Sequence, residues 1–306
     1  MIRFDQSVGQ MNCVCIRHRL ASIDWPLLSC AHWHSPTGRI RIAIKRCLTI
    51  AGSDSGGGAG IQADLKAFAN AGCYGMSAIV ALTAQNTVGV SAVQEATPEF
   101  VLAQLDAVFS DIGVDAAKTG MLFSREIIEN VADFLAVNPV PLVVDPVMIA
   151  SSGAKLLQDD AVETLIERIF PLATVITPNV PEAEYLAGGS ASPKVLAERL
   201  YELGAPSVIV TGGHAEKPVD HLFDGITHTE IPVFRHERLA THGAGCTHSA
   251  TLAALLASGE TLVEAALGAA RIASDSVGQG LLEIGRGDAP VDVLDLSRRQ
   301  ATWRPA

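Results

Sequence analysis

The sequence predicts an α/β protein with a mostly parallel central sheet and helices on both faces. Short apolar runs of Val, Ile, Leu and Ala alternate along the chain with segments whose apolar residues recur at helical spacing. Several of these runs end at a glycine or a polar residue, as buried strands do where they open into loops. Aromatic residues make up only 5% of a chain that is 48% apolar, which argues against an aromatic-rich β-sandwich. Such alternation implies parallel strands joined by helical crossovers.

The individual elements follow from this pattern in chain order. A strand over 47–51 runs into a glycine-rich loop, and a helix over 61–69 follows it. Residues 97–99, Thr-Pro-Glu, predict a second helix with Phe100, Leu102 and Leu105 facing inward. Further strands are expected at 77–82, 116–121, 141–145, 174–177 and 207–210, further helices from 124 and at 159–169, 180–188, 193–203, 244 onward and 260–281, and an antiparallel excursion at 219–234.

We interpret residues 47–290 as one domain, followed by a loose arginine-rich tail over 291–306. Residues 1–46 are a different kind of sequence, because their net charge is +5 whereas the rest of the chain carries −16. Disorder, or a reading frame that starts too early, is the favoured interpretation of this extension, which we expect to be dispensable. A zinc site is a weaker alternative, because the Cys-x-Cys that starts at Cys13 does not match common finger spacings.

The composition also excludes broad classes of partner. A net charge of −11 argues against a general nucleic-acid surface. No apolar run reaches the length of about twenty residues that a membrane-spanning helix needs. Cys47, Cys73 and Cys246 are far apart in the sequence, which is typical of reduced thiols. We therefore expect a cytoplasmic protein that acts on small molecules.

Two glycine-rich turns stand far apart in the sequence. The first glycine turn is residues 52–60, and the anion turn is residues 241–249, which run straight into an apolar helical pattern. Glycines let successive N–H groups converge, and the helix adds its positive end, so such a turn can hold a phosphate without a lysine. The alternative is a tight turn without a ligand. Because neither a Walker A segment nor a Gly-x-Gly-x-x-Gly fingerprint is present, phosphate would be met chiefly by the anion turn.

Several blocks of residues, taken in order, carry a resemblance to one family. They resemble the hydroxymethylpyrimidine/phosphomethylpyrimidine kinases of thiamine biosynthesis, over roughly residues 47–285. The resemblance implies a ribokinase-like fold, a three-layer αβα arrangement. It also implies that ATP and Mg²⁺ are used to phosphorylate a pyrimidine alcohol and then its monophosphate. The blocks are residues 49–66, 84–87, 118–122, 144–148, 177–183, 212–214 and 241–247.

On the substrate side, the resemblance implies that Asp64 and Gln85 hold the polar edge of the aminopyrimidine. The ring would be lined by Gly52, Thr83, Met121 and Val147. The alternatives are that Asp64 is an exposed helix residue and that Gln85 caps a loop.

On the phosphate side, Asp145, Asn179 and Glu182 match the residues that the family uses for magnesium and phosphate. Mg²⁺ takes oxygen ligands and keeps water, so Asp145 and Glu182 could act through water. The alternative is a strand-end cap for Asp145 and a helix-capping pair for the other two. Thr211 and Gly213 would meet the phosphates of ATP. Many family members carry lysine at the position of Thr211, so a phosphate-facing cation is missing there.

The anion turn supplies the predicted catalytic groups. By resemblance, the backbone N–H groups of Gly243, Ala244, Gly245 and Cys246 would form an anion hole. Cys246 stands where most ribokinase-like enzymes carry an aspartate base. A helix N-terminus lowers a thiol pKa, so a Cys246 thiolate would take the proton of the substrate hydroxyl. The alternative is that Cys246 only fits a tight turn as a small side chain.

Three functions therefore compete. The favoured one is the kinase that makes the pyrimidine diphosphate for thiamine synthesis. A pyridoxal or pyridoxine kinase is the alternative within the same class, because that vitamin ring has a similar size. A ligand-binding homologue without turnover is the third hypothesis. A homodimer is compatible with all three, and the sequence leaves the oligomeric state open.

Overall fold

The computed structural model describes residues 43–149, 153, 156–158, 160–212, 218–236 and 240–302. The described residues from Ile44 onward form one structural unit. The expectations for residues 1–42, zinc at Cys13 included, and for Gly213 fall outside the described residues. No helix in the described ranges is long and apolar enough to cross a membrane.

The described strands form one nine-stranded sheet with the order β3-β2-β1-β4-β5-β6-β7-β8-β9. The six strands from β2 to β7 in this order run parallel, as predicted. β3 pairs antiparallel at one edge, and β8 and β9 pair antiparallel at the other. The strands are β1 (Arg46–Asp54), β2 (Tyr74–Gln85), β3 (Val90–Glu95), β4 (Ala116–Thr119), β5 (Leu142–Val144), β6 (Val175–Ile176), β7 (Val208–Val210), β8 (Val219–Phe223) and β9 (His228–Pro232).

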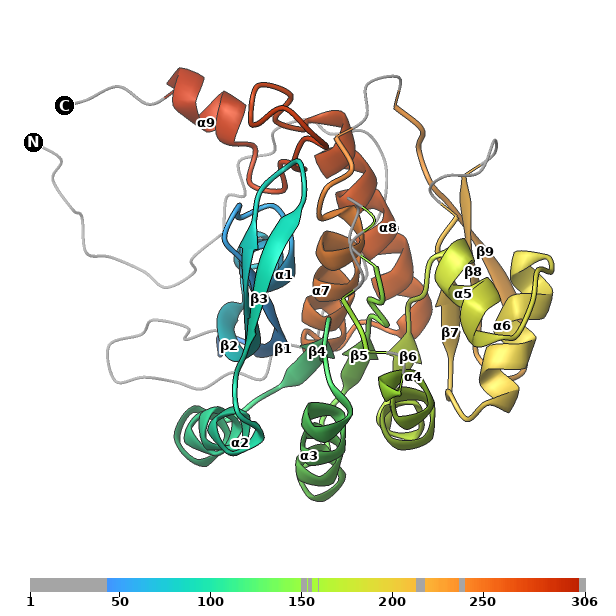
Figure 1. The fold of residues 1–306 in the computed structure, drawn as a ribbon. Helices are drawn as coiled ribbons and strands as arrows, with labels where there is room; N and C mark the ends of the chain where they lie inside the picture. Colours follow the sequence, from blue (N-terminus) through green and yellow to red (C-terminus); the bar gives the residue numbers. More distant parts are fainter. Residues whose placement is uncertain are drawn as a thin grey trace, which may run out of the picture. The chain divides into compact units, whose positions relative to one another are not determined.

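Helices cover both faces of this sheet (Figure 1). α1, α7 and α8 pack on one face, and the helices from α2 to α6 pack on the other, so the predicted three-layer arrangement is confirmed. The helices are α1 (Gly60–Asn70), α2 (Pro98–Ala107), α3 (Arg125–Val137), α4 (Ala161–Thr164), α5 (Val180–Leu186), α6 (Pro193–Glu202), α7 (Ala244–Ala257), α8 (Leu262–Gly278) and α9 (Leu296–Thr302).

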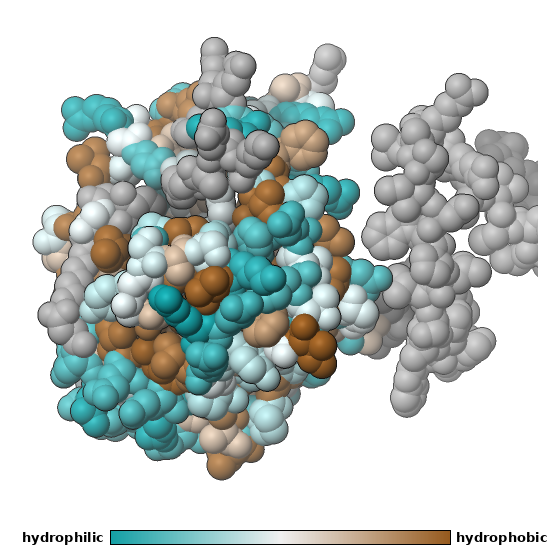
Figure 2. Space-filling model, turned by 90° about the vertical axis from the view of Figure 1, so that its right-hand side faces the viewer, coloured by the Kyte–Doolittle hydropathy of each residue, from teal (hydrophilic) through white to brown (hydrophobic). Residues whose placement is uncertain are grey.

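The core lies in two apolar clusters, one on each side of the sheet. β1 contributes to both, because Cys47 belongs to the cluster under α7 and Leu48 to the cluster under α3. Both side chains are fully buried, which explains why this strand reads as a continuous apolar run. In the view from the β8–β9 side, apolar side chains gather in small groups separated by polar ones (Figure 2).

The predicted domain, residues 47–290, is too short at both ends. β1 already includes Arg46, whose guanidinium lies 2.9 Å from Asp115. At the other end, Val291, Asp292 and Val293 are buried, and α9 follows. The loose tail expected from residue 291 is therefore wrong for these three residues.

Two local expectations are confirmed only in part. Phe100 was expected to face inward but is 62% exposed, whereas Leu105 is buried as expected, and Val101 is buried beside it. The expected helix at 159–169 is α4 followed by a π-helical turn over Leu165–Ile169. These differences leave the carboxyl ends of the parallel strands unchanged.

Candidate active site

A cavity of about 1210 Å³ lies beyond the carboxyl ends of the parallel strands and reaches the start of α7. Ligands of open α/β sheets bind at this edge. The cavity brings together most of the predicted site residues, which come from segments far apart in the sequence. It is lined by Gly52, Thr83, Gln85, Met121, Asp145, Val147, Asn179, Glu182, Thr211, Gly243, Ala244, Gly245 and Cys246. Among the described site residues, Asp64 is the exception.

The first glycine turn and the anion turn pack directly on each other. Gly243 has φ +85°, and a Cβ at this position would overlap the carbonyl oxygen of Gly58. A Cβ at Gly58 would in turn overlap the ring of His242. Glycine is therefore required at both contacts, by its backbone angle at one and by lack of space at both. The contact fixes the two turns relative to each other.

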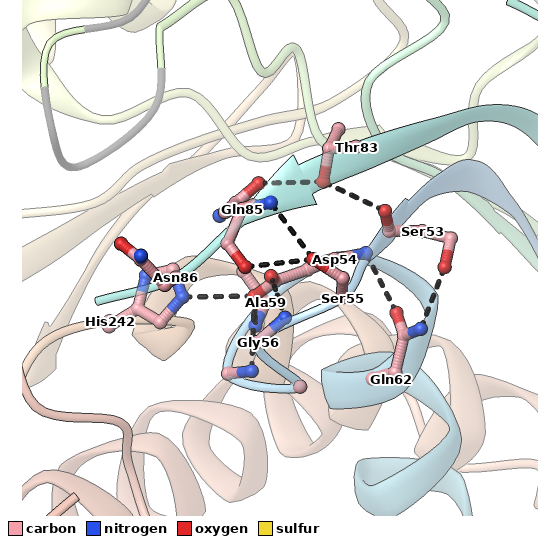
Figure 3. Close-up of polar contacts among 12 residues, drawn as sticks. Ser53, Asp54, Ser55, Gly56, Ala59, Gln62, Thr83, Gln85, Asn86 and His242 are labelled. Atoms are coloured by element: carbon pink, nitrogen blue, oxygen red, sulfur yellow. Dashed lines mark hydrogen bonds and ion pairs between the residues drawn. The ribbon is translucent and has the colours of Figure 1, made fainter. Parts of the chain in front are cut away.

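Asp54, at the end of β1, holds these two turns together (Figure 3). Its carboxylate accepts the backbone N–H groups of Gly56 at 2.8 Å, Gly58 at 3.0 Å and Ala59 at 2.8 Å. It also lies 3.0 Å from Nε2 of His242 in the anion turn. Although burial opposes its charge, the hydrogen bonds from His242 and the backbone hold the pKa of Asp54 below its usual range. The carboxylate thus links both turns while it stays ionised.

We expect Asp54→Asn to lower the free energy of unfolding at neutral pH by about 2 kcal/mol, the scale of hydrogen bonds to a charged group. Because the folded-state pKa is depressed, this stabilisation is present above the unfolded pKa of about 3.9 and is lost as pH falls through the folded pKa. Urea unfolding of both proteins between pH 3 and pH 7 should therefore show a difference that shrinks at the acid end. A difference of equal size at both ends would contradict the ionised link, and Asp111→Asn, at an exposed position, serves as the control.

The segment that follows α8 returns to the anion turn. Asp288 accepts hydrogen bonds from the backbone N–H of Thr241 at 3.2 Å and from its hydroxyl at 3.0 Å. The backbone of His242 donates to Ala289 O at 3.2 Å and accepts from the N–H of Val291 at 3.1 Å. We call residues 288–291 the C-terminal strap. It holds the backbone of the anion turn, and its Pro290 also lies beside Gly58 of the first glycine turn.

Gln85, the last residue of β2, presents its amide to the cavity beside the first glycine turn. Its Oε1 lies 3.1 Å from the hydroxyl of Thr83, whose single proton is shared with the carbonyl of Ser53 at 2.9 Å (Figure 3). Its backbone N–H donates to the hydroxyl of Ser55 at 2.8 Å. These contacts fix the orientation of the Gln85 amide. Its Nε2 makes no hydrogen bond within the described ranges and can donate to a ligand.

Gly52 leaves room at this end of the cavity. A Cβ at Gly52 would overlap the terminal methyl group of Met121, so the two residues are in direct contact. Met121 and Val147 provide apolar surface in the same cavity. A flat heterocycle with polar edges fits this combination of an amide donor and apolar walls.

Asp64 does not have either of its predicted roles. The residue is fully buried and does not line the cavity. Its carboxylate accepts hydrogen bonds from Nζ of Lys118 at 2.9 and 3.1 Å and from the hydroxyl of Thr49 at 2.6 Å. It is therefore neither a ligand contact in this structure nor an exposed helix residue. Asp64 acts on the cavity through Lys118.

Lys118 is the side chain that Asp64 supports. It lines the cavity and is fully buried in the protein. Its ammonium lies 3.7 Å from Asp145, which accepts a further hydrogen bond from Ser249 at 2.8 Å. Burial disfavours the charge, but the carboxylates of Asp64 and Asp145, together with the Cys246 thiol, raise the pKa of Lys118. The cavity wall therefore contains a permanent cation beside two carboxylates.

Cys246 lines the cavity with a pKa that differs from the prediction. Burial raises the pKa of its thiol to about 12, and the carboxylates of Asp64 and Asp145 add to this rise. Lys118 acts in the opposite direction but does not compensate. In the ligand-free protein, burial and the two carboxylates therefore outweigh the lowering of the pKa expected from the helix N-terminus.

The anion turn offers fewer free N–H groups than predicted. The N–H of Ala244 donates to the carbonyl of Thr241 at 3.0 Å, so it is already used. Gly245 and Cys246 lie in the first turn of α7, where backbone N–H groups have no partner within the helix. Together with the N–H of Gly243, which makes no hydrogen bond to the described residues, these N–H groups can bind an anion.

Asn179 and Glu182 form a capping box at the start of α5. The N–H of Glu182 donates to the side chain of Asn179 at 2.9 Å, and the N–H of Asn179 donates to that of Glu182 at 3.0 Å. The capping interpretation is thus confirmed, and both residues also line the cavity. Burial and the nearby carboxylate of Asp145 raise the pKa of Glu182 to about 8. Two carboxylates that oppose each other's charge fit a cation.

The described residues contain no cluster of three or more His, Cys, Asp or Glu side chains that could hold a metal ion alone. Asp145 and Glu182 are two oxygen donors, which suits Mg²⁺ because this ion keeps several waters and takes other ligands from substrate phosphates. Asp145 and Glu182 therefore fit Mg²⁺, the ion that the resemblance implies.

The prediction missed several residues of the cavity wall. Asp54, Lys118 and His242 lie inside the blocks that carried the resemblance, so a signal for them was present. Asp220 and His248 also line the cavity; His248 belongs to the anion turn, whereas Asp220 lies outside every block that carried the resemblance. Burial raises the pKa of Asp220, opposed by the charge of His248.

The profile of the family described as phosphomethylpyrimidine kinase matches residues 54–292. The chain belongs to this family. The matched region of this phosphomethylpyrimidine kinase family member contains the cavity wall from Asp54 to Asp288. The hydroxymethylpyrimidine/phosphomethylpyrimidine kinase of Rhizobium meliloti strain 1021 is 49% identical over 252 residues, which cover 80% of this chain and 95% of that protein.

Solved structures show the same fold in two kinds of vitamin kinase. An ADP complex of Bacillus subtilis pyridoxal kinase superposes with a TM-score of 0.77 at 36% identity, over 83% of this chain and 99% of that one. Phosphomethylpyrimidine kinase from Clostridium difficile 630 superposes with a TM-score of 0.66 at 43% identity, over 74% of this chain and 96% of that one. The ribokinase-like fold class is therefore confirmed for this phosphomethylpyrimidine kinase family member.

Proposed function

We propose that the protein transfers the γ-phosphoryl group of ATP to the hydroxymethyl group of 4-amino-5-hydroxymethyl-2-methylpyrimidine. A second transfer to the monophosphate gives the pyrimidine diphosphate for thiamine synthesis. The observation that carries this proposal is one cavity with a heterocycle end at Gln85 and an anion turn at the start of α7. The identity of 49% to a kinase with this printed name supports the same substrate.

Gln85 would bind the pyrimidine edge through the Nε2 donor that Thr83 leaves free. Met121 and Val147 would cover the ring, and the missing side chain at Gly52 would leave room for it. This arrangement orients the hydroxymethyl group toward the anion turn, so that the reacting groups are held in position rather than activated covalently.

The N–H groups of Gly245 and Cys246 would bind the oxygens of the transferring phosphoryl group. Phosphoryl transfer requires positioning and charge stabilisation, and fixed donors are already oriented before the charge develops. Losing one such donor costs about 3 kcal/mol in comparable oxyanion sites. Asp54 holds the ring of His242 and the C-terminal strap holds its backbone, so both keep these donors in place.

Mg²⁺ would be held by Asp145 and Glu182, in part through water. When bound, it supplies positive charge that neutralises the phosphate oxygens. Lys118 fixes Asp145 from behind, and Asn179 fixes Glu182 through the capping box. Thr211 would contribute its hydroxyl to a phosphate on the same side.

We keep Cys246 as the proposed acceptor of the substrate proton. With a pKa of about 12, only a small fraction of the thiol is ionised at neutral pH in the ligand-free protein. Lys118 is the fixed positive charge that favours the thiolate. The proposal therefore has a consequence for pH, because activity through a thiolate must rise with pH across the neutral range.

We expect Cys246→Ala to lower kcat about 100-fold, the lower range for loss of a general base, with little change in either KM. Cys246→Ser should lose a similar factor, because a serine hydroxyl does not ionise in this range. The pH profile of kcat should rise through neutral pH in the wild type and be flat in both variants. An alanine variant with near-normal kcat would remove the thiol from the mechanism and leave the N–H groups as the main contribution.

Pyridoxal phosphorylation is the competing activity within this fold. The sequence is 49% identical to a pyrimidine kinase and 36% identical to the structurally similar pyridoxal kinase, which favours the pyrimidine. The test is an ATP-consumption assay with the pyrimidine alcohol, its monophosphate, pyridoxine and pyridoxal side by side. Highest kcat/KM on the pyrimidine supports the proposal, highest kcat/KM on a pyridoxine-type ring overturns it, and no turnover on any supports the ligand-binding homologue.

We also propose a cytoplasmic location, supported by Cys47, Cys73 and Cys246, which are free thiols in the described part of the chain. The homodimer stays a prediction, which light scattering on the purified protein would check.

A further inference from the structure

His248 is a buried histidine that makes no side-chain hydrogen bond to the described part of the chain. It lies within the anion turn, near the start of α7, is 6% exposed and lines the cavity. Neither Nδ1 nor Nε2 has a hydrogen-bond partner among the described residues. A buried donor or acceptor without a partner costs free energy, so such groups in a native site call for an explanation. A ligand in the cavity would supply the missing partner.

Asp220 faces His248 from β8. Its Oδ2 lies 3.6 Å from Nε2 of His248, close enough for an ion pair but too long for a direct hydrogen bond. Its Oδ1 accepts the N–H of Gly212 at 2.8 Å, which fixes the carboxylate to the loop after β7. Thr211 in the same loop pairs with Asn179 through an isolated bridge. A continuous wall therefore runs from Asn179 to His248.

This wall lies at the opposite end of the cavity from Gln85. Four strand intervals separate β1, which carries Gly52, from β7, which precedes Thr211. At about 4.8 Å for each interval, the separation is roughly 19 Å. The anion turn lies between the two ends, because Gly243 contacts Gly58 on the side of β1 and His248 faces Asp220 on the side of β8. A pyrimidine bound at Gln85 cannot reach His248, whereas a triphosphate that approaches the anion turn from the other side passes it.

We propose that His248 binds the polyphosphate of the nucleotide: its imidazole N–H donates to a phosphate oxygen, and Asp220 orients the ring from behind. This proposal deepens the ATP side of the proposed function and rests on it. His248 is then a binding residue for the nucleotide, and Asp220 is a positioning residue that connects it to the loop after β7. The phosphate would be the partner that Nδ1 lacks, while Nε2 faces Asp220.

The test compares His248→Leu with the wild type by isothermal titration calorimetry, using AMP-PCP and adenosine as separate probes. We expect the affinity for AMP-PCP to fall about 10- to 100-fold, the range for a hydrogen bond to a charged group. The affinity for adenosine should stay within about 2-fold, since no phosphate is present. An unchanged AMP-PCP affinity, or an equal loss for adenosine, would overturn the proposal. Because neither probe needs the pyrimidine, this result is independent of which vitamin is the substrate.

A thermal melt separates binding from folding. The leucine substitution removes two unpaired polar atoms but also leaves the buried Asp220 without its facing charge, so the melt compares Asp220→Asn with Asp220→Asn/His248→Leu, and the double variant should have an equal or higher melting temperature. A clear drop would mean that the histidine is structural and would count against the proposal. His248→Gln keeps an N–H donor and should recover most of the AMP-PCP affinity; a glutamine variant as weak as the leucine variant would contradict the donor role.

His228 offers a matched control outside the cavity. One of its ring nitrogens, Nδ1, is also buried and has no partner in the described ranges, while Nε2 lies 3.0 Å from Glu198. His228→Leu should therefore leave the affinity for AMP-PCP unchanged. A loss as large as that of His248→Leu would show that removing any buried histidine weakens the site, and would contradict the specific contact.

Discussion

Asp64→Ala is expected to lower the free energy of unfolding by about 3–5 kcal/mol, the cost of removing one partner from a buried ion pair. Both Asp64 and Lys118 are fully buried, so solvent cannot replace the lost carboxylate around the ammonium. Asp145 remains nearby at 3.7 Å, but it is also the residue proposed to face Mg²⁺. Urea unfolding followed by circular dichroism measures the effect.

The control for this prediction is an exposed ion pair. Arg125 and Glu129 lie 2.8 Å apart on the surface of α3, and Glu129→Ala should cost no more than about 0.5 kcal/mol. The double variant Asp64→Leu/Lys118→Met should recover much of the stability, since both charges are then absent. If Asp64→Ala were as stable as the wild type and lost only pyrimidine affinity, the carboxylate would be a ligand contact after all.

Gln85→Ala is expected to raise the KM for the pyrimidine by about 100-fold or more, with an upper range near 10⁴-fold when a buried polar heterocycle loses its partner. The KM for ATP should change little. The part of the cavity wall that we propose binds the nucleotide, at Thr211 and His248, lies at the opposite end of the cavity from Gln85. Steady-state kinetics with each substrate varied in turn measures the two constants.

The matched control for Gln85 is Gln94 on the edge strand β3, which is exposed and lies outside the cavity wall. Gln94→Ala should leave both KM values unchanged. If Gln85→Ala raised only the KM for ATP, the two ends of the cavity would be assigned the wrong way round.

Much of the fold could be predicted because its central strands are buried on both faces. Such strands appear in the sequence as uninterrupted apolar runs, as Leu142–Val144 does. β3 was missed because an edge strand with a mostly exposed surface carries little apolar signal. Phe100 was placed inward from its spacing, but Val101 and Leu105 form the inner row of α2. Tertiary packing decides which of two adjacent rows of side chains on a helix faces the core. The apolar pattern of the helix alone does not show which row this is.

The site could be predicted where a short, continuous stretch of sequence supplies the groups that contact the ligand, as at Gln85 and the anion turn. The role of Asp64 was not, because its partner Lys118 is 54 residues away and the pair forms only in the folded protein. The pKa of Cys246 was misjudged for the same reason. The helix N-terminus is visible in the sequence, whereas the burial and the two carboxylates that outweigh it come from other elements of the fold.

The C-terminal strap also decides where this protein can be shortened or fused. A gene that stops at codon 290 matches the boundary expected from the sequence, yet it deletes Val291, whose N–H holds the carbonyl of His242. Purification tags and fluorescent reporters therefore belong after α9, since a linker inserted between Asp288 and Val291 would pull on the turn that receives the phosphate. A poorly active shortened protein would thus report on the choice of its last codon, and not on the chemistry of the enzyme.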